Sequence, residues 1–314
     1  LLDARRGEYA VYDIDFRLPP LVVLELDTVT GRTRELARED DWRRVWLDQQ
    51  GRLRLALEQS EKRFRYLYRA DDAKKWVPLD TLVKGATPLG FTVGGDNLLG
   101  ARSVPLGFDV NGKVLFIATN VGRNTFAVRA LDLTTGRLQS DFEVGHDRFD
   151  LIEPTALTAG EVLRFDPHTR SLAGVSVSTA RRDTTWFDPG MKALQEKLNQ
   201  QLAPLRCELR EWTADRTRFL VEVWGPSAPG GFIVADAATG KLIRCGERAP
   251  WLTEAKRNPT HEFDFLSADG RRLAGSLTAP RTPRLNPPPV LVYFHDGPWF
   301  CDSPLFNRGA QTLA

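Results

Sequence analysis

The feature that most constrains this chain is a repeated unit of two strand-like runs bounded by aspartates. Each copy has an aspartate in a polar turn, an apolar run, a polar break, a second apolar run and a second aspartate. The three copies extend over 48–71, 109–132 and 215–236, so their two aspartates are 23, 23 and 21 residues apart. This spacing fits two antiparallel strands joined by a hairpin, and its recurrence indicates a series of similar β-sheets.

The apolar runs inside the three copies are the strands that the unit predicts. They are Leu53–Leu57 with Phe64–Tyr68, Val114–Ile117 with Ala127–Leu131, and Phe219–Val223 with Phe232–Val234. Two copies end in an aspartate followed by Thr and Gly, and related turns occur at 27–31 and 166–170. These turns recur on average roughly every 50 residues, which is the period of four-stranded propeller blades. The sequence therefore predicts a mainly β fold, with a β-propeller of five or more blades over residues 1–250 that lacks part of its N-terminal end.

The aspartates of these units are interpreted as turn formers. A short carboxylate accepts hydrogen bonds from backbone N–H groups two or three residues further on, and glycine supplies the positive φ that a tight turn requires. Such a turn needs no catalytic role for its aspartate. No residue between 1 and 250 is therefore assigned to a substrate site.

One stretch breaks the β pattern and predicts an amphipathic helix. Asp188 is a suitable N-cap, Pro189 a suitable first helical residue, and apolar side chains follow at Met191, Leu194, Leu198 and Leu202. Their spacing places them on one face of about three turns. We expect this face to pack against its own domain.

Charge and metal-ligand patterns exclude several classes of function. The chain has 43 basic and 41 acidic residues, a net charge of +2, spread along its length, so no nucleic-acid partner is expected. The cysteines Cys207, Cys245 and Cys301 are far apart, and the four histidines have no metal-ligand spacing. We expect no metal, no cofactor and no disulfide scaffold.

The ends of the sequence give weaker expectations. No apolar run approaches the about 20 residues of a membrane span, so no membrane partner is expected. The chain begins with Leu1-Leu2-Asp3 rather than Met, and N-terminal residues are expected to be missing. The compartment, cytoplasmic or periplasmic, and a homo-oligomeric state both stay open.

After residue 250 the repeat stops and a second domain is predicted over 251–314. An Asp269-Gly270 turn joins two strand-like runs between 262 and 280, which indicates a hairpin. A proline-rich loop leads to the apolar run Val290–Phe294, which ends in 295–298, His-Asp-Gly-Pro. A buried strand that ends in a glycine turn is typical of the oxyanion loop of an α/β-hydrolase.

The order of propeller, hairpin, strand and His-x-Gly-Pro-Trp resembles the prolyl oligopeptidase family, on its acylaminoacyl-peptidase and dipeptidyl-peptidase side. The resemblance extends over the whole chain and is most specific over 251–314, where Phe306–Ala314 corresponds to the first helix of the hydrolase domain. It implies a serine peptidase that hydrolyses short peptides, with the propeller restricting access to the active site. A short peptide is then the expected substrate.

The resemblance also implies where the chemistry takes place. Family members carry His-Gly-Gly-Pro where this chain has His295, Asp296, Gly297 and Pro298. Gly297 and the backbone around Asp296 would stabilise the oxyanion, and His295 would hold the loop. No Gly-x-Ser-x-Gly occurs in the sequence, so the catalytic triad is expected C-terminal of residue 314 and none of it within this chain.

Two other functions stay open. A propeller can serve as a binding scaffold without any activity. The chain can also belong to a catalytically decayed pseudo-peptidase, because Asp296 replaces the glycine beside the oxyanion. A Gly-x-Ser-x-Gly motif in the following hundred or so residues of the reading frame would favour the active enzyme.

Overall fold

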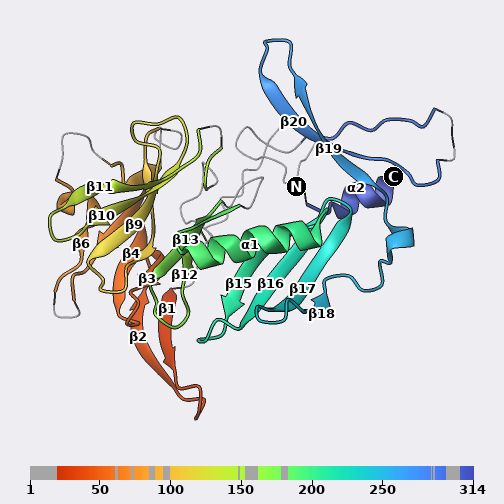
Figure 1. Ribbon diagram of the computed structural model, residues 1–314. Helices are drawn as coiled ribbons and strands as arrows, with labels where there is room; N and C mark the ends of the chain where they lie inside the picture. The colour runs from red at the N-terminus through yellow and green to blue at the C-terminus, as the bar shows by residue number, and fades with distance from the viewer. Residues whose placement is uncertain are drawn as a thin grey trace, which may run out of the picture.

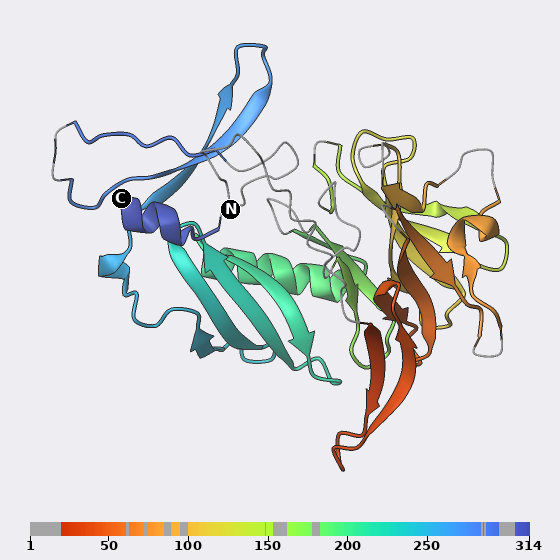
Figure 2. The same ribbon diagram turned by 180° about the vertical axis from the view of Figure 1, so that it is seen from behind.

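A computed structural model shows a mainly β protein with two α-helices in its described part (Figures 1 and 2). It describes residues 20–60, 63–71, 74–84, 89–94, 100–147, 149–152, 162–177, 183–283, 285, 287–294 and 305–314. The predicted β-rich fold is confirmed.

The described strands form six antiparallel sheets that follow one another along the chain. The N-terminal hairpin consists of β1 (Leu21–Leu26) and β2 (Thr33–Glu39), and sheet A of β3 (Trp42–Leu47), β4 (Leu53–Ser60), β5 (Arg63–Tyr68), β6 (Val77–Pro78) and β7 (Thr92–Gly94). Sheet B consists of β8 (Ser103–Phe108), β9 (Val114–Thr119), β10 (Ala127–Asp132) and β11 (Arg137–Val144). Sheet C consists of β12 (Leu163–Phe165), β13 (Leu172–Ser176) and β14 (Thr184–Trp186). Sheet D consists of β15 (Arg206–Trp212), β16 (Arg218–Gly225), β17 (Ala228–Asp236) and β18 (Leu242–Glu247), and the C-terminal hairpin of β19 (Thr260–Leu266) and β20 (Arg272–Thr278).

The repeated unit of the sequence corresponds to the two middle strands of a sheet. The predicted pairs of runs are β4 with β5, β9 with β10, and β16 with β17, each an antiparallel pair. In sheets B and D every strand pairs with the next one along the chain, as in a propeller blade. Five antiparallel sheets lie before residue 250 in the described part of the chain, although in sheet A both β6 and β7 pair with β5.

The aspartate turns have the hydrogen bonds that their residue types predict. Asp132 Oδ1 accepts from the N–H groups of Thr134 at 2.8 Å and Thr135 at 2.9 Å, and the Asp132 carbonyl accepts from Gly136 N–H. Gly136 has a φ of +72°, which a side chain would strain. The same carboxylate-to-backbone bonds occur at Asp27, Asp166 and Asp236.

Each successive pair of the five sheets before residue 250 shares one apolar core. The core between the N-terminal hairpin and sheet A contains Trp42, Ala56 and Leu67; the core between A and B contains Leu55, Tyr66, Phe108 and Ile117; and the core between B and C contains Val104, Phe116, Val128 and Val175. The fourth core joins sheets C and D through Ala173, Trp186, Leu209 and Val221. The sheets are therefore packed face to face in chain order, which is how propeller blades bury both of their faces.

The predicted helix is α1, Pro189–Leu202, between sheets C and D (Figure 1). Asp188 caps it, accepting hydrogen bonds at Oδ1 from the N–H groups of Gly190 and Met191. Met191 and Leu198 are buried in the core that joins sheets C and D. The cap, the first-turn proline and the packing of the apolar face on its own domain are all confirmed.

The second predicted region agrees with the structure except at one strand. The hairpin around Gly270 is present as β19 and β20, and the predicted final helix is α2, Arg308–Leu313. Short 3-10 helices occur at Leu79–Leu82 and Glu254–Lys256. Val290–Phe294, predicted as a buried strand, is irregular, and its side chains are 66–81% exposed. A strand forms only with a neighbour to accept its backbone hydrogen bonds, and no described strand lies beside this run.

The glycines of the aspartate turns provide a test of the turn geometry. Gly136 and Gly240 have similar backbone conformations, with φ of +72° and +69°. At Gly136 an added Cβ would lie 2.0 Å from the Leu82 carbonyl oxygen. At Gly240 it would meet only Lys197 Nζ, 3.9 Å away. We expect Gly240→Ala to lower the free energy of unfolding by about 1 kcal/mol, the cost of left-handed backbone. Gly136→Ala should cost a further 1–3 kcal/mol or so, because the backbone of residue 82 must move. Urea denaturation measures both, and equal losses would contradict the close approach.

Candidate functional site

The predicted oxyanion loop, His295 to Pro298, lies outside the described residues. The segments on both sides of it are described, at 287–294 and 305–314. The described elements that precede and follow this loop in the chain are the crossover 254–260, the C-terminal hairpin and helix α2.

The C-terminal hairpin is amphipathic. On one face the Phe263 and Phe265 rings lie 5.9 Å apart, centroid to centroid, and Phe263 pairs across the hairpin with Gly275. A Cβ at Gly275 would lie 2.8 Å from Phe263 Cζ, so glycine leaves room for the aromatic ring. Phe263 and Phe265 are half-exposed, so this apolar face is only partly covered by the described residues.

Polar contacts attach the crossover to sheet D. Arg206 Nη2 of β15 donates to both carboxylate oxygens of Glu262 on β19, each at 2.9 Å. The Thr260 N–H donates to Ser227 Oγ, in the turn between β16 and β17, at 2.8 Å. The hairpin is thus held by directional bonds to one end of sheet D, where Figures 1 and 2 both place it.

Helix α2 is attached to the same crossover by a reciprocal pair of amides. The Asn258 N–H donates to Gln311 Oε1 at 2.8 Å, and Gln311 Nε2 donates back to the Asn258 carbonyl at 2.9 Å. Asn258 Nδ2 also donates to the Gln311 carbonyl at 3.2 Å. The α2 end of the segment that contains residues 295–298 is therefore tied to Asn258 of the crossover.

A second group of polar side chains, the Glu208 cluster, lies at the joint of sheets C and D. Its members are Arg164, Ser176, Thr184, Glu208, Arg210, Glu222 and Arg248. Glu208 and Glu222 are directly opposite each other on β15 and β16, and both are 2% exposed. Two buried carboxylates on opposed positions of neighbouring strands would repel each other without cations between them.

The cations and hydroxyls of the cluster surround Glu208. Its Oε1 accepts from Arg164 Nη2, Ser176 Oγ and Thr184 Oγ1, all at 2.8 Å, and its Oε2 lies 3.3 Å from Arg210 Nη1. Burial alone would raise the pKa of the Glu208 carboxyl, but Arg164, Arg210 and the two hydroxyls outweigh it and lower that pKa. Glu208 is thus held ionised.

Arg210 joins the two glutamates. It also donates from Nε to Glu222 Oε2 at 2.8 Å, while the half-exposed Arg248 pairs with Glu222 Oε1. Each carboxylate therefore has at least two arginine partners. A carboxylate with its lone pairs occupied in this way is suited to fixing the position of neighbouring strands rather than to proton transfer.

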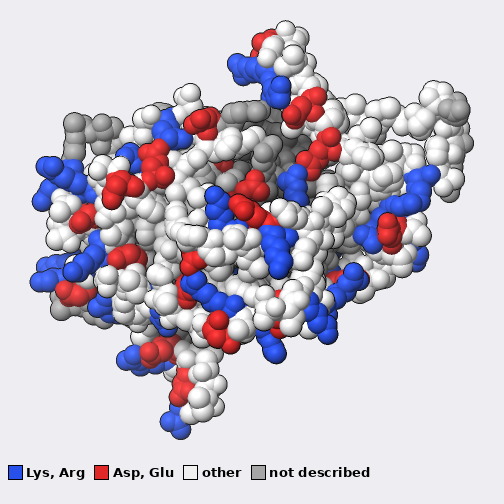
Figure 3. Space-filling model, in the orientation of Figure 1, with Lys and Arg blue, Asp and Glu red and all other residues white. Residues whose placement is uncertain are grey.

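Other chemistry finds no support among the described residues. Burial, together with the charge of Glu208, raises the pKa of the Cys207 thiol to about 11, although a hydrogen bond from Gln195 opposes it, so this thiol is not an activated nucleophile. No group of three or more His, Cys, Asp and Glu side chains in the described ranges could hold a metal ion. Nor is any described helix long and apolar enough to cross the membrane. On the face shown in Figure 3, basic and acidic side chains are interspersed.

Sequence reasoning missed the Glu208 cluster. Glu208 and Arg210 alternate with apolar residues in a half-polar strand, a pattern that predicts solvent exposure for the charged positions. The burial of Glu208 depends on Ser176, Thr184 and Arg164 of sheet C, more than twenty residues earlier in the chain. No local signal in the sequence indicates that contact.

Comparison with known sequences places the chain near one group of enzymes. No family model matches the sequence. Over 217 residues it is 28% identical to dipeptidyl aminopeptidase BIII of Pseudoxanthomonas mexicana, a match that covers 67% of this chain and 30% of that protein. The chain thus spans about a third of the length of this curated relative.

Solved structures give a looser likeness. A puromycin-hydrolyzing peptidase of Mycobacterium tuberculosis aligns with a TM-score of 0.46 and 14% identity over 81% of this chain and 36% of its own. A puromycin hydrolase aligns with a TM-score of 0.41 and 16% identity, over 80% of this chain and 36% of its own. Prolyl oligopeptidase B from Galerina marginata aligns with a TM-score of 0.35 and 9% identity, over 82% of this chain and 36% of its own. The sequence match, rather than these alignments, carries the functional argument.

The Glu208 cluster generates a pH-dependent prediction. Because the folded-state pKa of Glu208 is lowered, its contribution to stability is complete above the ordinary glutamate range and is lost as the pH falls through and below that range. We expect Glu208→Gln to lower the free energy of unfolding by about 3 kcal/mol at pH 7, since it removes the buried negative charge that Arg164 and Arg210 contact. The difference from the unmodified protein should shrink below about pH 4.

Denaturation with urea at a series of pH values measures this difference. Glu247→Gln is the matched control, because Glu247 pairs with Arg244 on the exposed strand β18 and should change stability by no more than about 0.5 kcal/mol. A loss in Glu208→Gln that does not vary with pH would contradict the assignment.

Proposed function

Since the chain resembles the prolyl oligopeptidase family in its motifs and matches a dipeptidyl aminopeptidase in sequence, we propose that it is part of a serine peptidase that hydrolyses peptide bonds of short peptides. In this proposal residues 1–250 are the propeller and 251–314 the hinge and first part of the peptidase domain. The single observation that carries it is the match over 217 residues, 67% of the chain, to an aminopeptidase.

In the proposed enzyme the two parts have different roles. The propeller restricts the active site to peptides small enough to enter, and the oxyanion is stabilised by the backbone of the loop at His295, Asp296, Gly297 and Pro298. The nucleophilic serine, the acid and the base follow residue 314 in the complete protein. The polar attachment of the crossover to sheet D supports this division, because it holds the C-terminal hairpin at one end of sheet D.

A pseudo-peptidase is the second candidate, and one residue favours it. Asp296 replaces a glycine of the family motif beside the position of the oxyanion. A scaffold function without any peptidase domain is not favoured by the hairpin and α2, which are the elements that the resemblance to the family predicts at these positions.

Labelling with a fluorophosphonate probe tests the proposal. The complete protein, read on through the frame beyond residue 314, should be labelled at one serine and should hydrolyse chromogenic dipeptide amides. The 314-residue chain should not be labelled, because without nucleophile and base only the modest effect of binding and oxyanion contacts remains. An alanine in place of the labelled serine is the control, and a complete protein that is neither labelled nor active would contradict the proposal.

Asp296 generates a separate prediction. An ionised carboxylate about 5 Å from a developing oxyanion would oppose it by about 3 kcal/mol at an effective dielectric constant near 20, which corresponds to more than about a hundredfold in rate. We propose that catalysis in the complete protein is impaired but present. Asp296→Gly in the complete protein is then expected to raise kcat/KM by up to about a hundredfold.

The measurement is kcat/KM across pH for both proteins. Asp264→Asn, which removes a 60% exposed carboxylate of β19, is the control and should leave the rate unchanged. An equal or lower kcat/KM for Asp296→Gly at every pH would show that the carboxylate costs the enzyme nothing.

A further inference from the structure

Two arginines have backbone conformations that their residue type disfavours. Among the described non-glycine residues only Arg170 and Arg216 have positive φ, at +57° and +53°. A left-handed backbone costs an ordinary residue about 1–2 kcal/mol. Strain of this kind persists where the surroundings impose it, which makes the contacts of these two side chains informative.

Arg170 occupies a position that other turns give to glycine. In the aspartate turns that begin at Asp27, Asp132 and Asp236 the fifth residue is glycine with positive φ, whereas the turn that begins at Asp166 has Arg170. The backbone bond is conserved in kind, since the Arg170 N–H donates to the Asp166 carbonyl at 2.8 Å. The difference between the turns is therefore the side chain.

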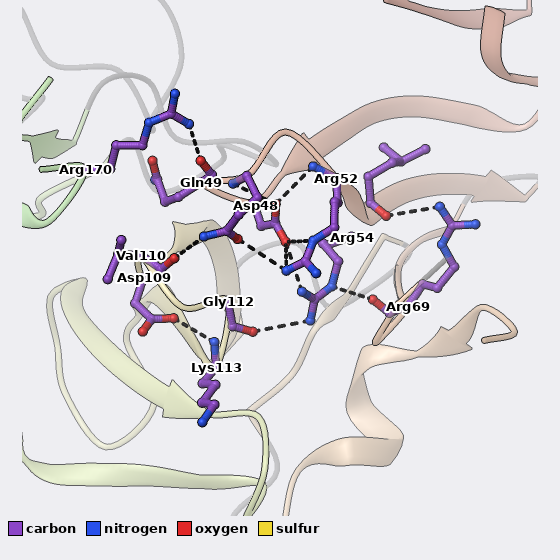
Figure 4. Close-up of polar contacts among 12 residues, drawn as sticks. Asp48, Gln49, Arg52, Arg54, Arg69, Asp109, Val110, Gly112, Lys113 and Arg170 are labelled. Atoms are coloured by element: carbon purple, nitrogen blue, oxygen red, sulfur yellow. Dashed lines mark hydrogen bonds and ion pairs between the residues drawn. The ribbon is translucent and has the colours of Figure 1, made fainter. Parts of the chain in front are cut away.

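The Arg170 side chain reaches a sheet that is not its neighbour in the chain. Its Nη1 donates to the carbonyl of Gln49, in the turn between β3 and β4 of sheet A (Figure 4). Arg170 itself lies in the turn between β12 and β13 of sheet C, and sheet B separates the two in chain order. One guanidinium thus connects the first turns of two sheets that share no core.

The same turn of sheet A is also bonded to sheet B (Figure 4). Gln49 Nε2 donates to the Phe108 carbonyl at 3.3 Å. The buried Arg54 donates from Nη2 to the Gly112 carbonyl at 3.3 Å, as Figure 4 shows. Arg54 is held in place by Asp48, whose Oδ2 lies 3.1 Å from Arg54 Nη1. The first turns of sheets A, B and C therefore form one bonded group.

Arg216 makes the corresponding connection from sheet D. It lies in the turn between β15 and β16, and its Nη2 donates to Asp166 Oδ2 at 3.1 Å, while Nη1 donates to Asp188 Oδ2 at 2.6 Å. Asp166 belongs to the first turn of sheet C, and Asp188 is the N-cap of α1. The indole Nε1 of Trp212 also donates to Asp166 Oδ2, at 3.1 Å.

All these turns lie at the same end of their sheets. Each joins the first described strand of a sheet to the second, so we call this end the first-turn end. Strand β16 runs from here, at Arg218, to Gly225 at the opposite end, where Ser227 binds the crossover to the C-terminal hairpin (Figure 1). The strained arginines and the attachment of the C-terminal segment are thus at opposite ends.

We infer that Arg170 and Arg216 act as a clamp that holds the first-turn end of sheets A, C and D together, so that relative movement of these sheets is confined to the end that carries the C-terminal segment. The left-handed backbone at each arginine directs its guanidinium to a neighbouring turn. The clamp is a property of the fold and does not depend on the proposed peptidase activity.

Hydrogen exchange on the 314-residue chain, measured by mass spectrometry, tests the clamp. Arg170→Gly keeps the turn and removes the side chain, and should raise the exchange rate of the β3–β4 turn amides, such as those of Gly51 and Arg52, by roughly tenfold. The amides of Gly190 and Met191, which are bonded to Asp188, should not change. Arg216→Gly should show the reverse pattern. Exchange should become faster at the start of α1, and the exchange rate of the amides at 48–52 should not change.

The two variants are each other's controls. Arg170→Asn, which tolerates a positive φ but cannot reach Gln49, guards against an effect of glycine itself and should behave like Arg170→Gly. Unchanged exchange at the β3–β4 turn in both Arg170 variants would overturn the inference. So would an equal increase in all regions, because it would indicate general destabilisation instead of a local clamp.

Discussion

Face-to-face packing of successive sheets on shared apolar cores is the interaction on which the rest of this structure depends. Leu53–Leu57 of β4 shows it most clearly, since all five residues are buried although their side chains alternate between the two faces of the sheet. A sheet that buries both faces needs a neighbour on each side, so no single sheet here can be stable alone. This requirement produces the regular period of the sequence, because each sheet must present the same two apolar faces to the next.

Apolar packing draws the sheets together but does not fix their relative rotation, since the hydrophobic effect has no direction. The buried polar groups at the joints supply direction. The hydrogen bond from Arg54 Nη2 to the Gly112 carbonyl forms in only one placement of sheet B. In the same way, Glu208 is paired only where sheet C supplies its hydroxyls and its guanidinium. Burying such groups has a large desolvation cost, and they are tolerated because each is paired. Their contribution is to the geometry of the stack more than to its stability.

The parts of the fold that were predicted from the sequence are those determined by local chemistry. An aspartate followed by Thr-Gly forms its turn with atoms four residues apart, and Asp188 caps α1 with the next three residues, so both were visible in the sequence. The contact of Arg170 with Gln49 spans 121 residues, so no local pattern in the sequence indicates it. The strand predicted at 290–294 failed for a related reason, because an apolar run indicates that a strand can form but not that a partner lies beside it. The predicted oxyanion loop stays a prediction, since residues 295–298 lie outside the described part.

The two ends of sheet D differ in how they are joined to the remainder of the chain, and this difference bears on the candidate site. At the first-turn end, sheet D is joined to sheet C both by an apolar core and by the bonds of Arg216 and Trp212 to Asp166. At the other end, the C-terminal segment is joined by hydrogen bonds and one ion pair, while the apolar face of β19 and β20 stays half-exposed. Hydrogen bonds to partly exposed groups contribute only about 1 kcal/mol each, so this attachment sets an orientation without providing a large stabilisation. The position of the segment that carries residues 295–298 therefore depends on a few directional bonds at Ser227, Asn258 and Gln311, whereas the propeller-like sheets keep their arrangement through burial.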